Sequence, residues 1–130
     1  MTTKLIETEM TYGSELRRIR EEVGVSISHV ARSLGVTTQY LSRIELGLKP
    51  PPANHFRTLE ILQAIRRPDE WRHLVALSVK HYRRVMIDLT GMPDYFYEIM
   101  TNLQVSFCED SLSREQWGAI GDILKEGNRT

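Results

Sequence analysis

The 130-residue sequence contains a single cysteine, Cys108. One thiol excludes an internal disulfide framework and a zinc site built from several cysteines. No apolar run approaches the roughly 18 to 20 residues that a membrane-spanning helix needs. Residues 1–10 also lack the apolar stretch of a signal peptide. We therefore expect a soluble, cytoplasmic protein.

Signs of catalysis are also scarce. The four histidines, His29, His55, His73 and His81, have no metal-ligand spacing such as His-Glu-x-x-His. His73 and His81 are separated by about two helical turns, too far to share a metal without a third ligand. No glycine-rich phosphate loop is present, and no motif surrounds Cys108. We expect no enzymatic activity, no bound metal and no cofactor.

The whole chain has no excess charge of either sign, because 17 Lys and Arg balance 17 Asp and Glu. The two parts of the chain nevertheless differ. Residues 1–84 carry 14 basic and 9 acidic residues, whereas residues 85–130 carry 3 and 8. A basic first part suits a polyanion and an acidic second part suits another protein, although uneven scatter also occurs by chance. The balanced total disfavours a nonspecific nucleic-acid binder.

The spacing of apolar residues predicts an all-α protein. Capping residues, glycines and prolines set the expected helix limits. These helices are Ser14 to Gly24, Ser26 to Gly35, Thr38 to about Leu46, Ala53 to Ile65, Pro68 onward, Pro93 to about Leu103, and Ser113 to about Lys125. Ser113 and Gln116 form a capping box. The fourth helix is expected to present Phe56, Leu59 and Leu62 to the core. Residues 84–89 are rich in β-branched side chains and favour a short strand or an extended segment.

The most informative pattern lies within residues 26–47, where Gly35 makes a tight turn between two short helices. Ala31 is the small residue needed where the second helix crosses the first. The side chains that hold the pair together from inside are Leu34, Val36, Leu41 and Ile44. Those left on the outer face of the second helix are Thr38, Gln39, Ser42 and Arg43. A polar outer face on such a helix is typical of a helix that reads DNA.

The run from Ser26 to Gly47, SISHVARSLGVTTQYLSRIELG, resembles the DNA-binding domain of the phage repressor and Cro type, the XRE family. Residues 13–65 as a whole are similar to the same domain. The resemblance implies a compact bundle of about five helices that binds operator DNA as a dimer. It also implies a bacterial or phage source and a buried ion pair between Arg20 and Glu45. Ile27 departs from the pattern, because the family usually has a phosphate-contacting glutamine there, and Leu46 replaces a polar residue.

Roles for the DNA-facing residues follow from their chemistry. Gln39 suits a bidentate contact to adenine, and Arg43 suits guanine or a phosphate. The full set of expected base contacts is Thr38, Gln39, Ser42 and Arg43. The expected contacts to the DNA backbone are Ser26, Ser28, Thr37, Tyr40 and Lys49. Tyr40 is as well suited to packing as to a contact with the DNA backbone. Arg17, Arg18 and Arg32 are as well suited to exposure to solvent as to a phosphate contact.

The last part of the chain carries a second apolar cluster, which needs a partner surface. We expect dimerisation through Tyr95, Phe96, Ile99, Met100, Leu103 and Trp117, because a single motif reads few base pairs and two-fold symmetry doubles the contacts. The alternative is that this segment packs back on the fourth and fifth helices. The expected organisation is an N-terminal arm (1–12), a five-helix, repressor-like DNA-binding domain (13–78) and a mainly helical dimerisation or interaction segment (79–130).

Two functions fit this sequence. The first is a sequence-specific transcriptional regulator, a repressor that binds a pseudo-palindromic operator as a homodimer with helix 37–46 in the major groove. The second is an antitoxin-like interaction protein whose C-terminal segment binds a partner protein, with DNA binding as autoregulation. The expected partners are therefore double-stranded DNA, a second copy of the chain and, on the second reading, another protein, with no membrane involved.

Overall fold

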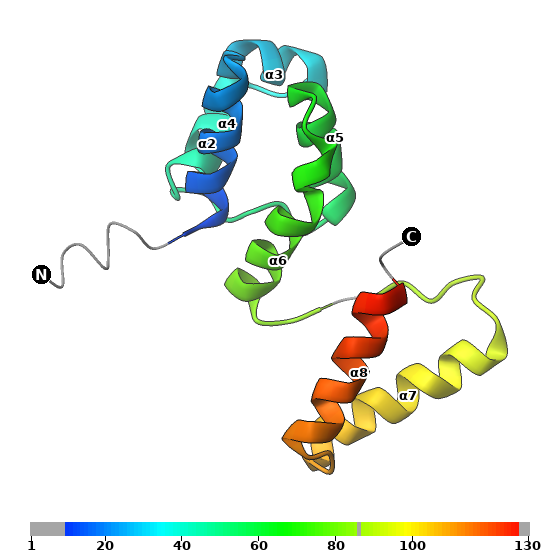
Figure 1. The fold of residues 1–130 in the computed structure, drawn as a ribbon. Coiled ribbons are helices and arrows are strands. Elements are labelled where there is room, and N and C mark those ends of the chain that lie inside the picture. The colour runs from blue at the N-terminus through cyan, green and yellow to red at the C-terminus, as the bar shows by residue number, and fades with distance from the viewer. Residues whose placement is uncertain (1–9, 86, 128–130) are drawn as a thin grey trace, which may run out of the picture. The chain divides into compact units, whose positions relative to one another are not determined.

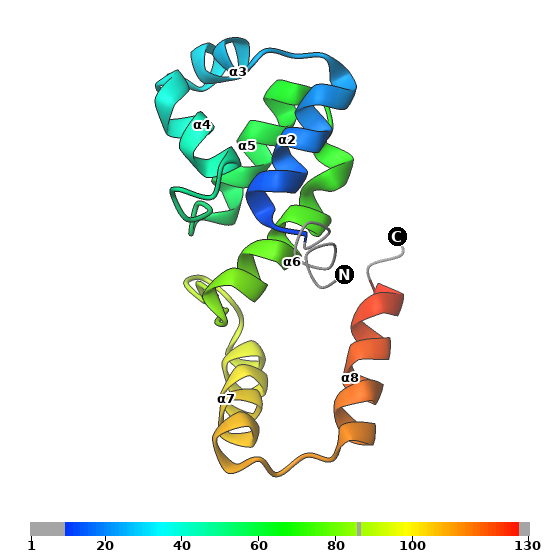
Figure 2. The ribbon, with the colours of Figure 1, turned by 90° about the vertical axis from the view of Figure 1, so that its left-hand side faces the viewer.

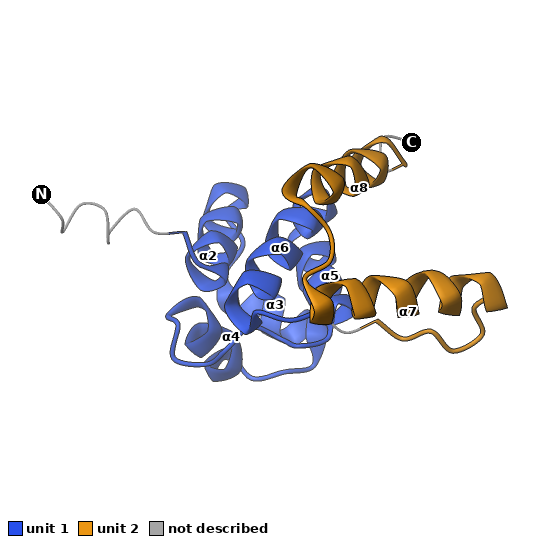
Figure 3. Ribbon diagram, turned by 90° about the horizontal axis from the view of Figure 1, so that it is seen from below, with its two compact units in different colours: residues 1–86 blue, residues 87–130 orange. Residues whose placement is uncertain are grey.

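The computed structural model describes residues 10–85 and 87–127. Its elements in chain order are α2 (Tyr12–Val23), α3 (Ile27–Leu34), α4 (Thr38–Glu45), α5 (His55–Ile65), the 3-10 helix η1 (Pro68–Glu70), α6 (Trp71–Tyr82), α7 (Asp94–Glu109) and α8 (Arg114–Gly127). The chain divides into two compact units, residues 1–86 and 87–130 (Figure 3). The predicted all-α class is confirmed for the described residues.

Two sequence-based expectations fall partly outside the described residues. Most of the expected N-terminal arm, residues 1–9, and Met86 in the expected extended segment are not described. The other residues of 84–89 form no strand. Because a strand needs a neighbouring strand to pair with, the described residues of this short β-branched run stay irregular.

The first helix begins earlier than predicted, because Thr11 rather than Ser14 is its N-cap. The Ser14 backbone N–H donates to Thr11 Oγ1 at 3.1 Å, and the Thr11 N–H donates to Ser14 Oγ at 3.0 Å. This capping box uses Ser14 as the third helical residue. Tyr12 is thereby drawn into the helix and the core, where it is almost fully buried.

The next two helices begin and end where the sequence predicts (Figure 2). Ser26 Oγ accepts the His29 N–H at 3.1 Å, and Thr37 Oγ1 accepts the Tyr40 N–H at 3.0 Å. Gly35 ends α3 in the left-handed conformation, with φ of 69°, which costs least for glycine. The turn between the two helices therefore has the short, fixed geometry of a helix-turn-helix.

The N-terminal unit is a bundle in which α2 packs on α4 and α6, while α3 packs on α4 and α5 (Figure 1). Its core contains Leu16, Ile19, Val30, Leu41, Ile44, Ile61, Leu62, Ile65 and Leu74. The prediction for Phe56 is wrong, because its side chain is 70% exposed. The buried face of α5 carries Thr58, Ile61, Leu62 and Ile65, and Phe56 precedes Thr58 by two residues, about 200° around the helix.

The C-terminal unit consists of α7 and α8. Helix α7 runs six residues beyond the predicted end at Leu103 and stops where Asp110 adopts a φ of 50°. The predicted capping box opens α8, with the Ser113 N–H donating to Gln116 Oε1 at 2.8 Å and the Gln116 N–H donating to Ser113 Oγ at 3.1 Å. The rings of Phe107 and Trp117 lie 4.6 Å apart between centroids. Among residues 87–127, none is buried.

Candidate nucleic-acid interface

Helix α4 separates its side chains into an inner and an outer face. Leu41 and Ile44 are buried in the core. Thr38, Gln39 and Arg43 are exposed and Ser42 is half-buried, so the four predicted base-contacting residues lie on one eight-residue helix. Within the described part of the chain, the side chains of Gln39 and Arg43 form no hydrogen bond or ion pair. Their polar groups are therefore free to contact another molecule.

The N-termini of α3 and α4 favour anions. Neither helix has an acidic residue in its first turn, and unpaired backbone N–H groups at a helix start attract phosphate. The predicted backbone-contacting residues Ser26, Ser28 and Thr37 are all exposed at or near these two starts. The caps of both helices and the polar face of α4 thus occur within a single motif.

Glu45 is the only acidic residue within 26–49, and Arg20 of α2 binds it. Arg20 Nε donates to Glu45 Oε2 at 2.7 Å, and Arg20 Nη2 donates to Glu45 Oε1 at 3.0 Å. Arg20 Nη1 also donates to the Val25 carbonyl oxygen at 3.0 Å. The side chains of Arg20 and Glu45 are only 15% and 6% exposed. The pair joins the last turn of α4 to α2 and neutralises the one carboxylate of the motif.

Tyr40 and Lys49, two predicted backbone contacts, lie together. Tyr40 is half-buried against the core, and Lys49 Nζ is 5.6 Å from the centroid of its ring, a cation–π distance. Tyr40 therefore packs against the core on the side away from solvent and contacts Lys49 through its ring. Ile27, which departs from the repressor-type pattern that the sequence otherwise resembles, also packs partly against the core. Its aliphatic side chain supports α3 and offers no polar contact to a phosphate.

Gly13 is a site residue that the pattern analysis did not single out. A Cβ atom at this position would lie 2.2 Å from the Ile44 carbonyl oxygen and 2.7 Å from that of Glu45. The first turn of α2 therefore touches the backbone of the last turn of α4. The available sequence signal was an isolated glycine next to Ser14, close to the start of an apolar-periodic helix.

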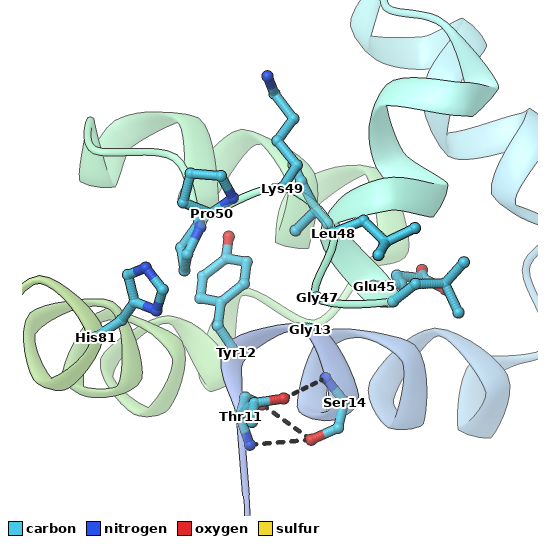
Figure 4. Close-up of a pocket in the computed structure, with 13 residues that line it drawn as sticks. Thr11, Tyr12, Gly13, Ser14, Glu45, Gly47, Leu48, Lys49, Pro50 and His81 are labelled. Carbon is cyan, nitrogen blue, oxygen red and sulfur yellow. Dashed lines mark hydrogen bonds between the residues drawn. The ribbon is translucent and has the colours of Figure 1, made fainter.

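A cleft of about 570 Å³ opens where this first turn of α2 meets the loop that follows α4 (Figure 4). Its walls include Tyr12, Gly13, Leu48 and His81, and Lys49 extends away from it (Figure 4). Leu46 and Leu48 are both exposed beside the cleft. The loop after α4 thus presents one cation and two apolar side chains next to the polar face of α4.

The arginines of α2 are engaged in ion pairs within the domain. Arg17 pairs with Glu21 at 3.2 Å, and Arg18 pairs with Glu15 at 3.1 Å and with Glu22 at 2.7 Å. Arg17 and Arg18 therefore already have acidic partners on α2. Arg32 is exposed and forms no ion pair among the described residues.

Two further contacts connect α2 to α6 and α5. His73 Nε2 lies 2.8 Å from Glu15 Oε1, and Tyr12 Oη lies 2.8 Å from Thr58 Oγ1. Burial alone would raise the pKa of the Glu15 carboxyl, but hydrogen bonds from Arg18 and His73 outweigh burial and lower it. Burial raises the pKa of Tyr12 to about 12 despite its bond with Thr58. Both groups support the helix that carries Arg20 and Gly13.

The predicted dimerisation residues fall into two sets on the C-terminal unit. Tyr95 and Ile99 of α7 are exposed, at 65% and 54%. The second set is half-buried, and its members are Phe96, Met100 and Leu103 of α7 and Trp117 of α8. The first three of these are spaced four and three residues apart and form one helical stripe. Tyr95 and Ile99 are therefore the predicted dimerisation residues whose side chains are exposed to a partner.

Residues 11–74 match the family model described as a helix-turn-helix domain. Neither curated proteins nor solved structures gave a match to the chain. Within residues 10–85 and 87–127, no helix is both long and apolar enough to cross a membrane, and no group of three or more His, Cys, Asp or Glu side chains is placed to hold a metal ion. The geometry of α3 and α4 agrees with this match, and both place a helix-turn-helix fold in the N-terminal unit.

Proposed function

We propose that the protein is a sequence-specific transcriptional repressor, similar to the phage repressor and Cro type, that binds a pseudo-palindromic operator as a homodimer. The exposed polar face of α4 carries this proposal. Its side chains have no partner within the described part of the domain, while the opposite face of α4 is locked into the core. A helix presented in this way fits the major groove, which is wide enough to admit it.

The base contacts are assigned by side-chain chemistry. Gln39 binds adenine through its amide, and Arg43 binds guanine through two parallel N–H donors. Thr38 contacts a thymine methyl group, and Ser42, half-buried at the centre of α4, accepts or donates a single hydrogen bond. Four side chains on one helix read only a few base pairs, which is why two copies are needed for useful affinity.

The backbone contacts orient α4 in the groove. The capped starts of α3 and α4 bind phosphates through Ser26, Ser28 and Thr37 together with backbone N–H groups. Lys49 and the hydroxyl of Tyr40 bind the sugar-phosphate chain beside them. The ion pair between Arg20 and Glu45 removes the only carboxylate of residues 26–49 from the interface, so no acidic group in that segment repels the DNA.

The second unit supplies the dimer contact. Residues 87–127 contain no buried side chain, and Tyr95 and Ile99 are exposed on α7. Two helices without a core of their own gain one by associating with another pair of helices. A second copy of this unit provides such a pair. We assign residues 13–78 to DNA binding and residues 79–130 to dimerisation.

The test is fluorescence anisotropy with DNA from upstream of the protein's own gene and a random duplex of equal length, across a salt series. Wild type should prefer the upstream DNA by about a thousandfold or more. Gln39→Ala and Arg43→Ala should each lose about 1 to 3 kcal/mol of specific binding. Arg72→Ala on α6 is the matched control, because it removes one exposed charge away from the motif. Equal, weak binding to both duplexes by all variants would reject the proposal.

A second candidate function also involves the C-terminal unit, residues 87–130, in which no described side chain is buried. Residues 85–130 carry 8 acidic and 3 basic residues, and this excess of negative charge suits a basic partner protein better than a second copy. In that case the protein is antitoxin-like, and DNA binding is autoregulation. Two experiments distinguish the repressor from the antitoxin-like protein. The first is light scattering of the purified protein, and the second is co-expression with the neighbouring gene. A homodimer mass favours the repressor, and a stoichiometric complex with the neighbouring product favours the antitoxin-like function.

A further inference from the structure

The end of α6 carries cations that have no acidic partner. Lys80 and Arg83 are exposed and form no ion pair among the described residues. Both line one cleft, whose other walls are Met10, Thr11, Tyr12, Leu77 and His81. No Asp or Glu lines this cleft, and none occurs in the sequence between Glu70 and Asp88. The positive charge at the end of α6 is therefore not compensated locally.

The carboxylates of the N-terminal unit are neutralised elsewhere. Within residues 10–85, every Asp and Glu pairs with an arginine of α2, of α5 or of the turn before η1. These carboxylates are Glu15, Glu21, Glu22, Glu45, Glu60, Asp69 and Glu70. Paired charges largely cancel at a distance, whereas unpaired cations produce a positive field that attracts a polyanion. The unpaired cations at the end of α6 are a source of such a field.

The end of α6 lies beside the loop that follows α4. The Tyr82 hydroxyl donates to the Pro51 carbonyl oxygen, which holds the last turn of α6 against this loop. His81 lines the same cleft as Lys49 (Figure 4), and it also lines the cleft of the two α6 cations. The two clefts are thus continuous. We call the side chains along them the basic strip, which consists of Lys49, Lys80, His81 and Arg83.

We propose that the basic strip binds the sugar-phosphate backbone of DNA beyond the phosphates that the starts of α3 and α4 contact. The proposal rests on the proposed function, in which Lys49 already binds the backbone beside α4. The same strand continues from Lys49 along the strip, and Lys80 and Arg83 each neutralise one of its phosphates. An exposed strip suits a continuous chain of diesters. Because phosphate contacts carry no sequence information, the strip raises affinity without changing which bases are preferred.

The test is DNA binding by the full chain across a salt series, with the upstream and random duplexes measured by anisotropy. Lys80→Gln combined with Arg83→Gln should weaken binding to both duplexes by the same factor. The slope of log K against log salt should become shallower by about 1.8, or about 0.9 for each lost phosphate contact. At 0.1 M salt this change corresponds to about 60-fold weaker binding relative to 1 M.

The matched control is Arg66→Gln combined with Arg72→Gln. It removes two exposed arginines that lie before and within the first turn of α6 and form no ion pair among the described residues. Its slope should equal that of wild type. Equal slopes for both double variants would overturn the basic strip, while a preference of wild type for upstream DNA would still support the proposed function. A wild type without that preference would reject the proposed function, and a shallower slope would still support the strip.

A pair of glycine variants separates DNA contact from stability. Arg83 and Arg66 both end a helix in the left-handed conformation, with φ of 60° and 69°, which costs least for glycine. Arg83→Gly and Arg66→Gly should both be at least as stable as wild type in thermal unfolding. Arg83→Gly should nevertheless bind both duplexes about eightfold more weakly at 0.1 M salt, and Arg66→Gly should bind as wild type does. Equal affinities of the two variants would show that Arg83 contacts no phosphate.

Discussion

Gly13 and Ile44 are in direct backbone contact: a Cβ atom added to Gly13 would lie 2.2 Å from the Ile44 carbonyl oxygen. The first turn of α2 thereby sets the position of the last turn of α4. A carbonyl group within a helix does not move without moving the helix. The orientation of α4 relative to α2 therefore depends on two features. One is the lack of a side chain at Gly13, and the other is the ion pair between Arg20 and Glu45.

Gly13→Ala should destabilise the protein by about 1 to 3 kcal/mol or more, because overpacking forces the backbone apart. Gly118→Ala is the matched control, since a Cβ atom there would have no neighbour within 4 Å. Alanine at position 118 should stabilise by about 0.5 to 1 kcal/mol through its better helix propensity. Urea unfolding of both variants measures the difference. Equal effects at the two positions would show that α2 and α4 are not in close contact.

Removing one partner of the ion pair between Arg20 and Glu45 should destabilise the protein more than removing both partners. Arg20→Met leaves Glu45 nearly buried without a partner and should cost about 3 kcal/mol. Arg20→Met combined with Glu45→Leu should recover part of that loss, because no buried charge remains. Thermal or urea unfolding of the single and double variants checks this. A double variant no more stable than Arg20→Met would contradict it.

Acid should weaken the contact between α2 and α6. The pKa of Glu15 lies below its ordinary value of 4.5, so the carboxylate stabilises the folded state above that pH, and this contribution is lost as pH falls through the folded pKa. Glu15→Gln should cost about 1 to 2 kcal/mol at pH 7, through lost charge-assisted bonds, and should flatten the acid dependence as pH falls below the ordinary value of 4.5.

Unfolding free energies across that pH range provide the measurement. Glu60→Gln is the control, because Glu60 is an exposed carboxylate on α5 whose one ion pair, with Arg57, spans 3.6 Å. Its acid dependence should match that of wild type. A Glu15→Gln protein that loses stability in acid as steeply as wild type would show that Glu15 is not part of the acid response.

Alkali should act through the buried phenol of Tyr12, whose pKa is raised by burial. With the pKa of Tyr12 raised to about 12 from 10.0, the neutral phenol stabilises the folded state fully below pH 10, and the contribution falls as pH rises towards 12. Tyr12→Phe should cost about 1 to 3 kcal/mol at pH 7, since Thr58 loses its partner, but should reduce the loss above pH 10. Thr58→Val should cost a similar amount and keep the steep alkaline loss. Denaturation at pH 7 and pH 11 separates them.

Short-range signals predicted much of this structure. The caps Ser26 and Thr37, the turn at Gly35 and the capping box of Ser113 and Gln116 involve atoms within four residues of one another. A pattern of polar and glycine residues at fixed spacing therefore determines them. The outward placement of Gln39 and Arg43 follows from the same helical period once Leu41 and Ile44 are assigned to the core.

Long-range packing determined what the sequence pattern missed. The contact between Gly13 and Ile44 and the pair of Glu15 with His73 join residues 31 and 58 positions apart, and no local signal marks them. Phe56 is apolar, yet the core is closed by the stripe that contains Thr58 and Ile61.

The most direct test of the central claim, that α4 reads bases through Gln39, pairs this residue with a single base. Operator half-site positions are substituted one at a time, and wild type and Gln39→Ala are compared on each duplex by anisotropy at one salt concentration. One A·T position should cost wild type about 1 to 3 kcal/mol when changed and cost Gln39→Ala almost nothing, while other positions penalise both equally. If every substitution penalises both proteins alike, Gln39 contacts no base, and the central claim is wrong.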